Sequence, residues 1–211
     1  MSGPVTRATE ADLNQLSHVI AEAFTDLAPS RWLIADRDER QQLFPGYFRL
    51  LAAHALAGGV VHTTPGRDAA ALWLPAGPGA PAGPGDYDQQ LTTATGRRAG
   101  RFRFFEQTLD ARHPAVAHWH LAILAVHPRA QNHGTGTALL RAGHQMTDAD
   151  ALPAYLEASD RRTRRLYLRH GYADHGMPLL LADGPLMYPM VREPRSPAAA
   201  PAAEPGRRTA G

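Results

Sequence analysis

Apolar residues recur with the period of a helix in the first quarter of this chain. One such series predicts an amphipathic helix and consists of Leu13, Leu16, Ile20 and Phe24. Thr9 and Asp12 precede it at the spacing of a helix-capping box. A second helical face, with a proline near a helix start or kink, consists of Phe44, Pro45, Tyr47, Phe48 and Leu51. The residues between these helices, 25–38, contain Pro29, Trp32 and several charges, which favours a loop.

Shorter apolar runs of strand length follow. Residues 60–64 and 69–74 flank a turn-rich spacer, which predicts an antiparallel hairpin. Residues 121–126 form another apolar run, which Pro128 ends because a proline cannot continue a central strand. Further strands are predicted at 4–8, 153–159 and 184–192, and a helix over 87–112.

Two segments lack a burial pattern. Residues 75–85, PAGPGAPAGPG, are predicted to be irregular, and they suit either a linker or a flap. Residues 193–211 are rich in Pro and Ala and are predicted to be a disordered C-terminal tail. We therefore expect one folded domain over 1–192.

A glycine turn follows the apolar run at 121–126. It contains Gln131, Asn132, His133, Gly134, Thr135 and Gly136, and a helix is predicted over 137–146. Free N–H groups and the helix dipole at such a start favour a phosphate. Thr137 stands where a P-loop needs Lys, and Leu139 stands where a dinucleotide fingerprint needs its third Gly, so both of those families are excluded. A plain helix-capping loop is the other interpretation of the turn.

The pattern Gln-x-x-Gly-x-Gly behind an apolar strand resembles the pyrophosphate-binding motif of the GNAT N-acetyltransferase superfamily. A second stretch, 153–172, resembles the superfamily's fifth strand, fourth helix and Leu-Tyr-x-x-x-Gly-Phe ending, with Tyr172 in the aromatic position. Residues 119–172 also look like the actinobacterial branch that includes puromycin N-acetyltransferase. This resemblance implies an α/β (α+β) fold: a single domain with a mixed, mostly antiparallel central sheet, flanked by helices, whose splayed central strand binds coenzyme A.

The resemblance also implies acetyl-CoA as cosubstrate and a small-molecule amine as acceptor, including antibiotics or their precursors. Leu124, Ala125 and Val126 would offer backbone groups to the pantetheine arm, with the Val126 amide as oxyanion donor. The diphosphate would be held by Gln131, Asn132, His133, Gly134, Thr135, Gly136 and Thr137. Asp160 stands where the superfamily often has an Asn that contacts the same arm, and its other interpretation is a helix N-cap. A homodimer is common in the superfamily.

Acyl transfer to an amine needs a proton acceptor for the amine and a proton donor for the departing thiolate. The resemblance assigns Tyr167 as the acid, against the interpretation of a tyrosine that only packs. Glu157 and His120 are the candidate bases, since they lie in neighbouring predicted strands. Trp32 is a candidate acceptor contact, with simple packing as the alternative.

Composition narrows the chemistry. The chain has no Cys, which excludes an acyl-cysteine intermediate. A formal net charge of +2 makes nucleic acid an unfavoured partner, despite two arginine clusters at 97–103 and 161–165. Clusters of this kind are usually solvated helix faces, although the second one also suits the phosphates of a cofactor. No run is long enough to span a membrane, so we expect a soluble cytoplasmic protein.

No metal site is expected from His118, His120, His170 or His175, because no carboxylate–histidine set at ligand spacing accompanies them. Three rival functions stay open. The fold could use an acyl carrier protein or an aminoacyl-tRNA as donor, it could be a non-catalytic coenzyme A binding module, or it could acetylate protein N-termini.

Overall fold

The computed structural model describes residues 4–195 of the 211-residue chain. A single sheet runs through it in the strand order β1-β2-β3-β4-β5-β8-β6, and β7 pairs with β8. All pairs are antiparallel except β4 with β5. The strands are β1 (Thr6–Arg7), β2 (Val60–Thr63), β3 (Ala69–Ala76), β4 (His118–Val126), β5 (Ala154–Ala158), β6 (Ala173–Asp174), β7 (Leu179–Leu180) and β8 (Leu186–Arg192). The predicted mixed, mostly antiparallel sheet is therefore confirmed.

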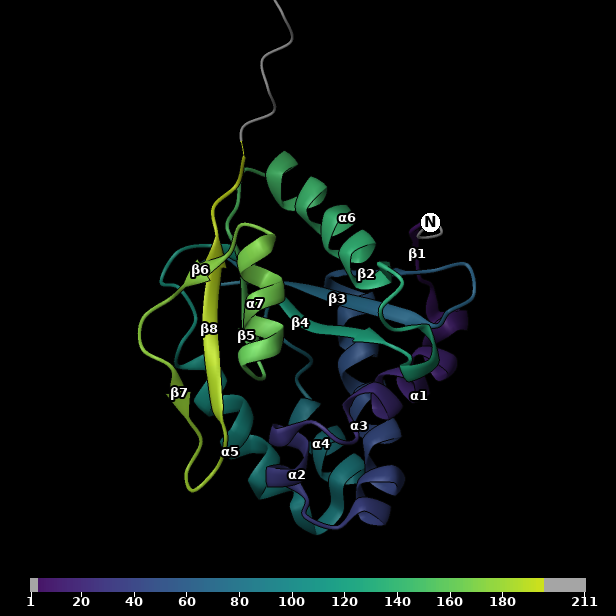
Figure 1. Cartoon of the computed structure of the whole chain (residues 1–211). Coiled ribbons are helices and arrows are strands. Elements are labelled where there is room, and N and C mark those ends of the chain that lie inside the picture. Colours follow the sequence, from purple (N-terminus) through teal and green to yellow (C-terminus); the bar gives the residue numbers. More distant parts are fainter. Residues whose placement is uncertain (1–3, 196–211) are drawn as a thin grey trace, which may run out of the picture.

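Helices cover both faces of this sheet (Figure 1). The α-helices are α1 (Leu13–Phe24), α2 (Ala28–Leu33), α3 (Arg37–Gly58), α4 (Tyr87–Thr95), α5 (Ala99–Asp110), α6 (Thr135–Ala149) and α7 (Arg161–Arg169). Short 3-10 turns lie at Glu10–Asp12, Gly96–Arg98 and Pro128–Ala130. No helix within residues 4–195 is long and apolar enough to cross a membrane.

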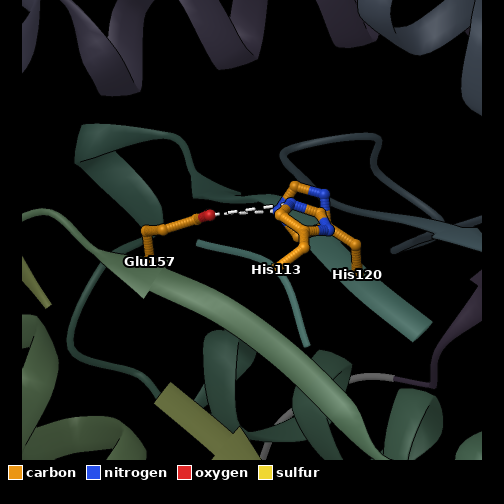
Figure 2. A group of neighbouring side chains, drawn as sticks. All are labelled: His113, His120 and Glu157. Carbon is orange, nitrogen blue, oxygen red and sulfur yellow. Dashed lines mark hydrogen bonds and ion pairs between the residues drawn. The ribbon is translucent and has the colours of Figure 1, made fainter. Parts of the chain in front are cut away.

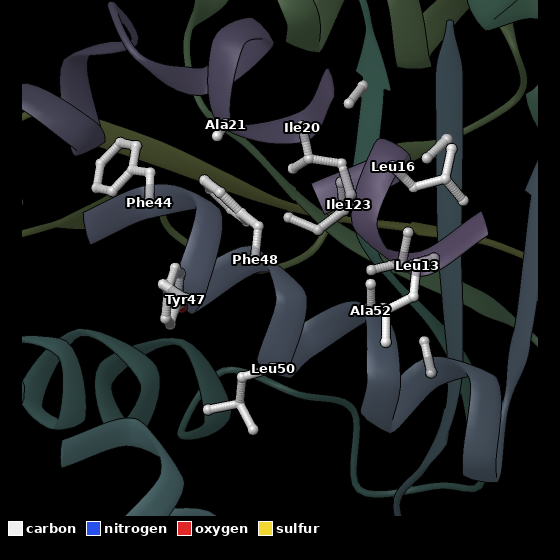
Figure 3. Packing of buried hydrophobic residues seen from close by; sticks show 14 of the residues in the cluster. Leu13, Leu16, Ile20, Ala21, Phe44, Tyr47, Phe48, Leu50, Ala52 and Ile123 are labelled. Carbon is white, nitrogen blue, oxygen red and sulfur yellow. The ribbon is translucent and has the colours of Figure 1, made fainter. Parts of the chain in front are cut away.

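Strand β3 shows how one run of residues supports two cores. Ala70 and Leu72 pack with α1 and α3 on one face, around Leu16, Ile20 and Phe48 (Figure 3). Ala71 and Trp73 face the other way and pack beneath α6 and α7. Side chains alternate along a strand, so a fully apolar strand must be buried on both faces. Each large apolar side chain buried in this way contributes about 1.5–3 kcal/mol to stability.

Close packing of α6 on the sheet depends on a glycine. A Cβ at Gly143 would lie 2.2 Å from the Trp73 ring, so a side chain there would force the helix and the strand apart. Trp73 itself is fully buried. The start of α6 is thereby held against β3 and β4, which fixes the position of the glycine turn that precedes it.

Several elements differ from the prediction. The predicted loop at 25–38 contains α2 and the first turn of α3, because Pro29 sits at a helix start, where its missing N–H costs nothing. Pro45 lies well inside α3. Pro75 and Ala76 belong to β3, which pairs only with β4 beyond Trp73, so that a residue without an N–H is tolerated there.

Other boundaries shift without changing the fold. The helix predicted over 87–112 is divided into α4 and α5 at Gly96, whose φ of +54° does not fit a continuous helix. The short strands β6 and β7 were not predicted from the sequence. Of the predicted disordered tail, residues 196–211 lie outside the described residues.

Candidate active site

Strands β4 and β5 separate soon after they meet. Their parallel pairing covers only Trp119 with Ala154 and His120 with Tyr155. Opposite β3, the register shifts so that Leu121 and Ile123 face consecutive β3 residues and Ala122 is an extra residue, a β-bulge. A bulge bends its strand. Because this one directly follows the last pair with β5, it accounts for the divergence of β4 from β5.

A cavity of about 890 Å³ opens between the two diverging strands. Leu124, Ala125 and Val126 line it from β4, while Glu157 and Ser159 line it from β5 and the turn that follows. These β4 residues pair with β3 along one edge of the strand, so their other edge faces the gap. Backbone groups along an unpaired strand edge are strong hydrogen-bonding partners for an extended ligand.

The glycine turn closes one end of this cavity, which we call the donor end. Its shape depends on two left-handed residues, Asn132 at φ +66° and Gly134 at φ +83°, a conformation that Asn and Gly tolerate best. The Gln131 side chain donates to the Val126 carbonyl at 3.1 Å and ties the turn to β4. The predicted residues that line the cavity are Gln131, Asn132, Gly134, Thr135, Gly136 and Thr137. His133 lies in the same turn but does not line the cavity.

Positive groups converge on the donor end. The first N–H groups of α6 have no intrahelical partner, and they open toward the turn. Arg162 and Arg169 of α7 line the cavity as well. By contrast, Arg164 of the same arginine cluster pairs with Asp174. The arginine cluster at 161–165 thus contributes Arg162 to the cavity and Arg164 to a surface ion pair, and Arg162 together with Arg169 suits an anionic ligand.

Tyr167 is the residue of α7 that is buried beneath the helix, and it lines the cavity. Its ring packs edge-on against Tyr172 at 5.6 Å. Burial, and then the charge of Asp160, raises the pKa of the Tyr167 phenol. The hydroxyl therefore stays protonated at neutral pH and is able to donate a proton or a hydrogen bond.

Asp160 forms the N-cap of α7. Its Oδ1 accepts from the Thr163 backbone N–H at 2.7 Å and from the Thr163 hydroxyl at 3.0 Å. The N-cap interpretation of this residue is confirmed. Asp160 also lines the cavity, but its carboxylate is already used by the helix.

A carboxylate–imidazole pair lies where the strands part. His120 Nε2 lies 3.1 Å from Glu157 Oε2, and the Glu157 side chain is only 5% exposed. Burial by itself raises the pKa of Glu157, but the charge and hydrogen bond of His120 and the charge of His113 outweigh it, so the net shift is downward. The two predicted base candidates are thus brought together, and both line the cavity.

His113 completes this cluster, and sequence reasoning did not single it out. It lies in the loop between α5 and β4, and its Nε2 is 3.7 Å from Glu157 Oε1 (Figure 2). Burial, and then the neighbouring charge of His120, lowers the pKa of His113 to about 4. Neither its spacing nor its neighbours in the sequence resemble a motif, so only the fold reveals it.

The far side of the cavity, which we call the acceptor end, is largely apolar but contains two carboxylates, Glu106 and Asp110. Glu106 of α5 accepts hydrogen bonds from the Tyr47 hydroxyl at 3.0 Å and the Tyr87 hydroxyl at 2.9 Å. Burial raises the pKa of Glu106, and the two tyrosine donors counter that shift. The other lining side chains here include Phe24, Phe44, Phe48, Leu51, Phe105, Leu109 and Asp110. Glu106 is a second cavity residue that sequence reasoning missed.

Trp32 lies outside this cavity. Its indole N–H donates to the Ala182 carbonyl at 2.8 Å, and the Arg101 guanidinium stacks 4.2 Å from its ring centre. It also packs against Phe104 and Phe105. The structure therefore places Trp32 among packing partners, beside a separate surface pocket and not in the wall of the cavity between β4 and β5.

Comparison with known proteins gives concordant results. The family model described as an acetyltransferase (GNAT) domain matches residues 93–174. An acetyltransferase structure from Corynebacterium glutamicum, described as histone acetyltransferase HPA2 and related acetyltransferase, is similar over 94% of this chain and 99% of its own, with 27% identity and a TM-score of 0.69.

Two insect enzymes share the fold at lower identity. Arylalkylamine N-acetyltransferase 2 from Aedes aegypti aligns with 90% of this chain and 98% of its own, at 10% identity and a TM-score of 0.64. A polyamine N-acetyltransferase from Drosophila melanogaster, which forms N-acetylagmatine, aligns with 90% of this chain and 99% of its own, at 13% identity and a TM-score of 0.60. At these identities the likeness concerns the fold alone.

Proposed function

We propose that this chain is a member of the GNAT acetyltransferase superfamily and that it transfers an acetyl group from acetyl-CoA to a primary amine of a small molecule. The observation that carries the proposal is the cavity between β4 and β5. It joins an anion-binding turn at one end to a buried carboxylate–imidazole pair further along. Such a cavity suits one ligand with a phosphate-rich end and a second ligand that must lose a proton.

The residues of the donor end fit acetyl-CoA. The free N–H groups at the start of α6, with Arg162 and Arg169, would hold its diphosphate, and the open edge of Leu124–Val126 would bind its extended arm by backbone hydrogen bonds. Asp160 is excluded as an amide-like donor, because its carboxylate only accepts and already caps α7. When bound, acetyl-CoA supplies an activated thioester carbonyl.

Different cavity residues carry out the proton transfers that the reaction requires. A protonated amine first gives up one proton to become a nucleophile. Its nitrogen then forms the new C–N bond while the C–S bond breaks, so a second proton leaves the nitrogen, one proton reaches the sulfur, and one is released to solvent overall. Glu157, held in place by His120, takes a proton from the amine either directly or through the imidazole. Tyr167 donates a proton to the sulfur from its neutral hydroxyl. Since the chain has no Cys, no acyl-thiol intermediate intervenes.

The acceptor end favours a small cationic amine with an apolar body. Its walls are mainly Phe and Leu side chains, and Glu106 offers a carboxylate that two tyrosines hold in place. A buried carboxylate attracts a cation strongly, because the local dielectric is low. This attraction strengthens the binding of a protonated amine, which then loses its proton at Glu157.

The proposal is tested by measuring thiol release from acetyl-CoA with a panel of amines, with mass spectrometry of the products. The panel should include aryl-alkyl amines, diamines, aminonucleosides and amino sugars, together with short peptides. We expect at least one small amine to be acetylated at nitrogen. Thiol release with peptides alone, or with no member of the panel, would contradict the proposal.

A further inference from the structure

Three potential metal ligands converge beside the cavity. His113 comes from the loop after α5, His120 from β4 and Glu157 from β5 (Figure 2). One ligand atom from each lies within 4.8 Å of the others. Two imidazoles and a carboxylate are a donor set that zinc and related divalent ions use.

A chain of hydrogen bonds fixes which nitrogen of His113 carries its proton. His118 Nδ1 lies 2.7 Å from the Val116 carbonyl oxygen, which can only accept, so His118 Nδ1 donates. With Nδ1 as its donor, a neutral His118 ring has no proton on Nε2, so this nitrogen accepts. The partner of His118 Nε2 is His113 Nδ1 at 3.0 Å, which must therefore donate. The Nε2 of a neutral His113 is left with a lone pair.

This lone pair faces a carboxylate oxygen. His113 Nε2 is 3.7 Å from Glu157 Oε1, both atoms are buried, and neither has a hydrogen-bond partner among the described residues. Only 5% of the Glu157 side chain is exposed. Two buried acceptors that face each other repel, and the repulsion is removed when a proton or a metal ion lies between them.

The spacing suits a small ion. Zinc binds imidazole nitrogen at about 2.0–2.1 Å and carboxylate oxygen at about 2.0–2.2 Å, so two ligand atoms on one zinc ion are at most about 4.2 Å apart. The observed separations of 3.7 Å for His113 and 3.1 Å for His120 from Glu157 lie within that limit.

We propose that His113, His120 and Glu157 form a binding site for one divalent transition-metal ion, with zinc as the best match. His118 and the Val116 carbonyl act as the outer shell that orients His113, the arrangement that metal-binding histidines usually have. His120 and Glu157 line the cavity, which provides the entry path and a side on which a fourth ligand can bind.

Zinc at this site has a consequence for catalysis that rests on the proposed function. A bound zinc ion is coordinated by the same lone pairs of Glu157 and His120 that would accept the proton from the amine. Zinc is therefore expected to inhibit acetyl transfer reversibly and to compete with the amine, while acetyl-CoA binding at the glycine turn is unaffected. Metal binding itself is measured without acetyl-CoA, so failure of the site and failure of the proposed function are told apart.

The test is equilibrium dialysis of the full-length, tag-free chain against zinc after removal of metals by a chelator. The absence of Cys means that thiolates do not contribute to the binding. We expect one zinc per chain, an affinity at least about tenfold weaker in His113→Asn and Glu157→Gln, and unchanged binding in the control His18→Ala, which alters an exposed histidine of α1.

Cobalt in place of zinc gives a second readout on the unmodified chain, because a four-coordinate site with two imidazoles produces intense visible absorption. If circular dichroism shows that His113→Asn does not fold, two results still test the site. They are the cobalt spectrum of the unmodified chain and the zinc affinity of the nearly isosteric Glu157→Gln. Stoichiometric zinc with the cobalt spectrum supports the site. Absence of zinc binding, or zinc binding that both site variants retain in full, overturns it.

Discussion

The two ends of the cavity are built in different ways. The donor end is formed mainly by one continuous segment, Leu124 to Thr137, which presents mostly backbone groups, and α7 adds Arg162 and Arg169. The acceptor end and the carboxylate–imidazole cluster use side chains from α3, α5, β4 and β5 and from the loop that carries His113. A site made of backbone in one segment leaves a sequence motif, whereas a site assembled from distant side chains leaves none.

This difference predicts distinct responses to mutation. Substitutions of side chains at the carboxylate–imidazole pair and on α7 should change the rate of the chemical step, and substitutions at the glycine turn should change the affinity for acetyl-CoA. Substitutions at the acceptor end should change the KM of the amine only. The expected effects decrease in that order.

Glu157→Gln should have the largest effect. The amide keeps the shape of the side chain but cannot take up the amine proton, so kcat should fall about 10³-fold, within the range for general acid–base catalysis. The Kd of acetyl-CoA should stay the same, as measured by calorimetry. The exposed Glu10→Gln is the matched control, and a kcat within twofold of the parent for Glu157→Gln would remove Glu157 from the mechanism.

Tyr167→Phe should lower kcat about 100-fold, because the thiolate loses its proton donor while the ring and its packing against Tyr172 remain. The Kd of acetyl-CoA should again be unchanged. Tyr188→Phe, which alters a hydroxyl 3.4 Å from Arg161 and outside the cavity, is the control. Full turnover by Tyr167→Phe would show that solvent protonates the thiolate.

Gly136→Ala tests the donor end alone. A Cβ there would lie 3.7 Å from Val126 Cγ2, an ordinary contact, so the fold accommodates it, but the methyl group fills space that a diphosphate needs. The affinity for acetyl-CoA should fall about tenfold, which corresponds to about 1.4 kcal/mol. Gly100→Ala, in the first turn of α5 with nothing within 4 Å of its Cβ, is the matched helix control. Equal affinities in the two variants would argue against phosphate binding at this turn.

Glu106→Gln should have the smallest effect. The amide oxygen can still accept from Tyr47 and Tyr87, but one of the two carboxylates at the acceptor end is lost and only Asp110 remains. The KM of a cationic amine should rise about fivefold, roughly 1 kcal/mol, with little change in kcat. Initial rates at two salt concentrations measure this, since added salt should raise the KM of the amine more for the parent than for the variant, which keeps only Asp110. A KM that is insensitive to both changes would place the amine elsewhere.

Much of the fold could be predicted because its signals are local. The glycine turn, the start of α6 and the capped start of α7 at Asp160 each depend on residues close together in sequence, and the structure confirms these elements. The 3.6-residue period predicted the buried face of α1 for the same reason. Pro75 and the helix in 25–38 were misjudged because tertiary pairing and helix-start position override proline propensity.

The acceptor side could not be predicted, since its residues meet only in three dimensions. The β-bulge at Ala122, which separates β4 from β5, depends on the register against β3 and not on any residue type at that position. His113 lies in a loop and Glu106 beside two phenylalanines, and neither spacing indicates a cavity. Trp32 was a reasonable candidate from its residue type, but its partners Arg101 and Ala182 are far away in sequence.

The central claim is that both ends of one cavity are filled at the same time, and that the acetyl group passes directly between them. Initial rates measured with acetyl-CoA and the best amine of the panel, each varied at several fixed levels of the other, test this most directly. We predict intersecting double-reciprocal lines, as a ternary complex requires. Parallel lines, together with a covalent acetyl adduct on the protein, would contradict it.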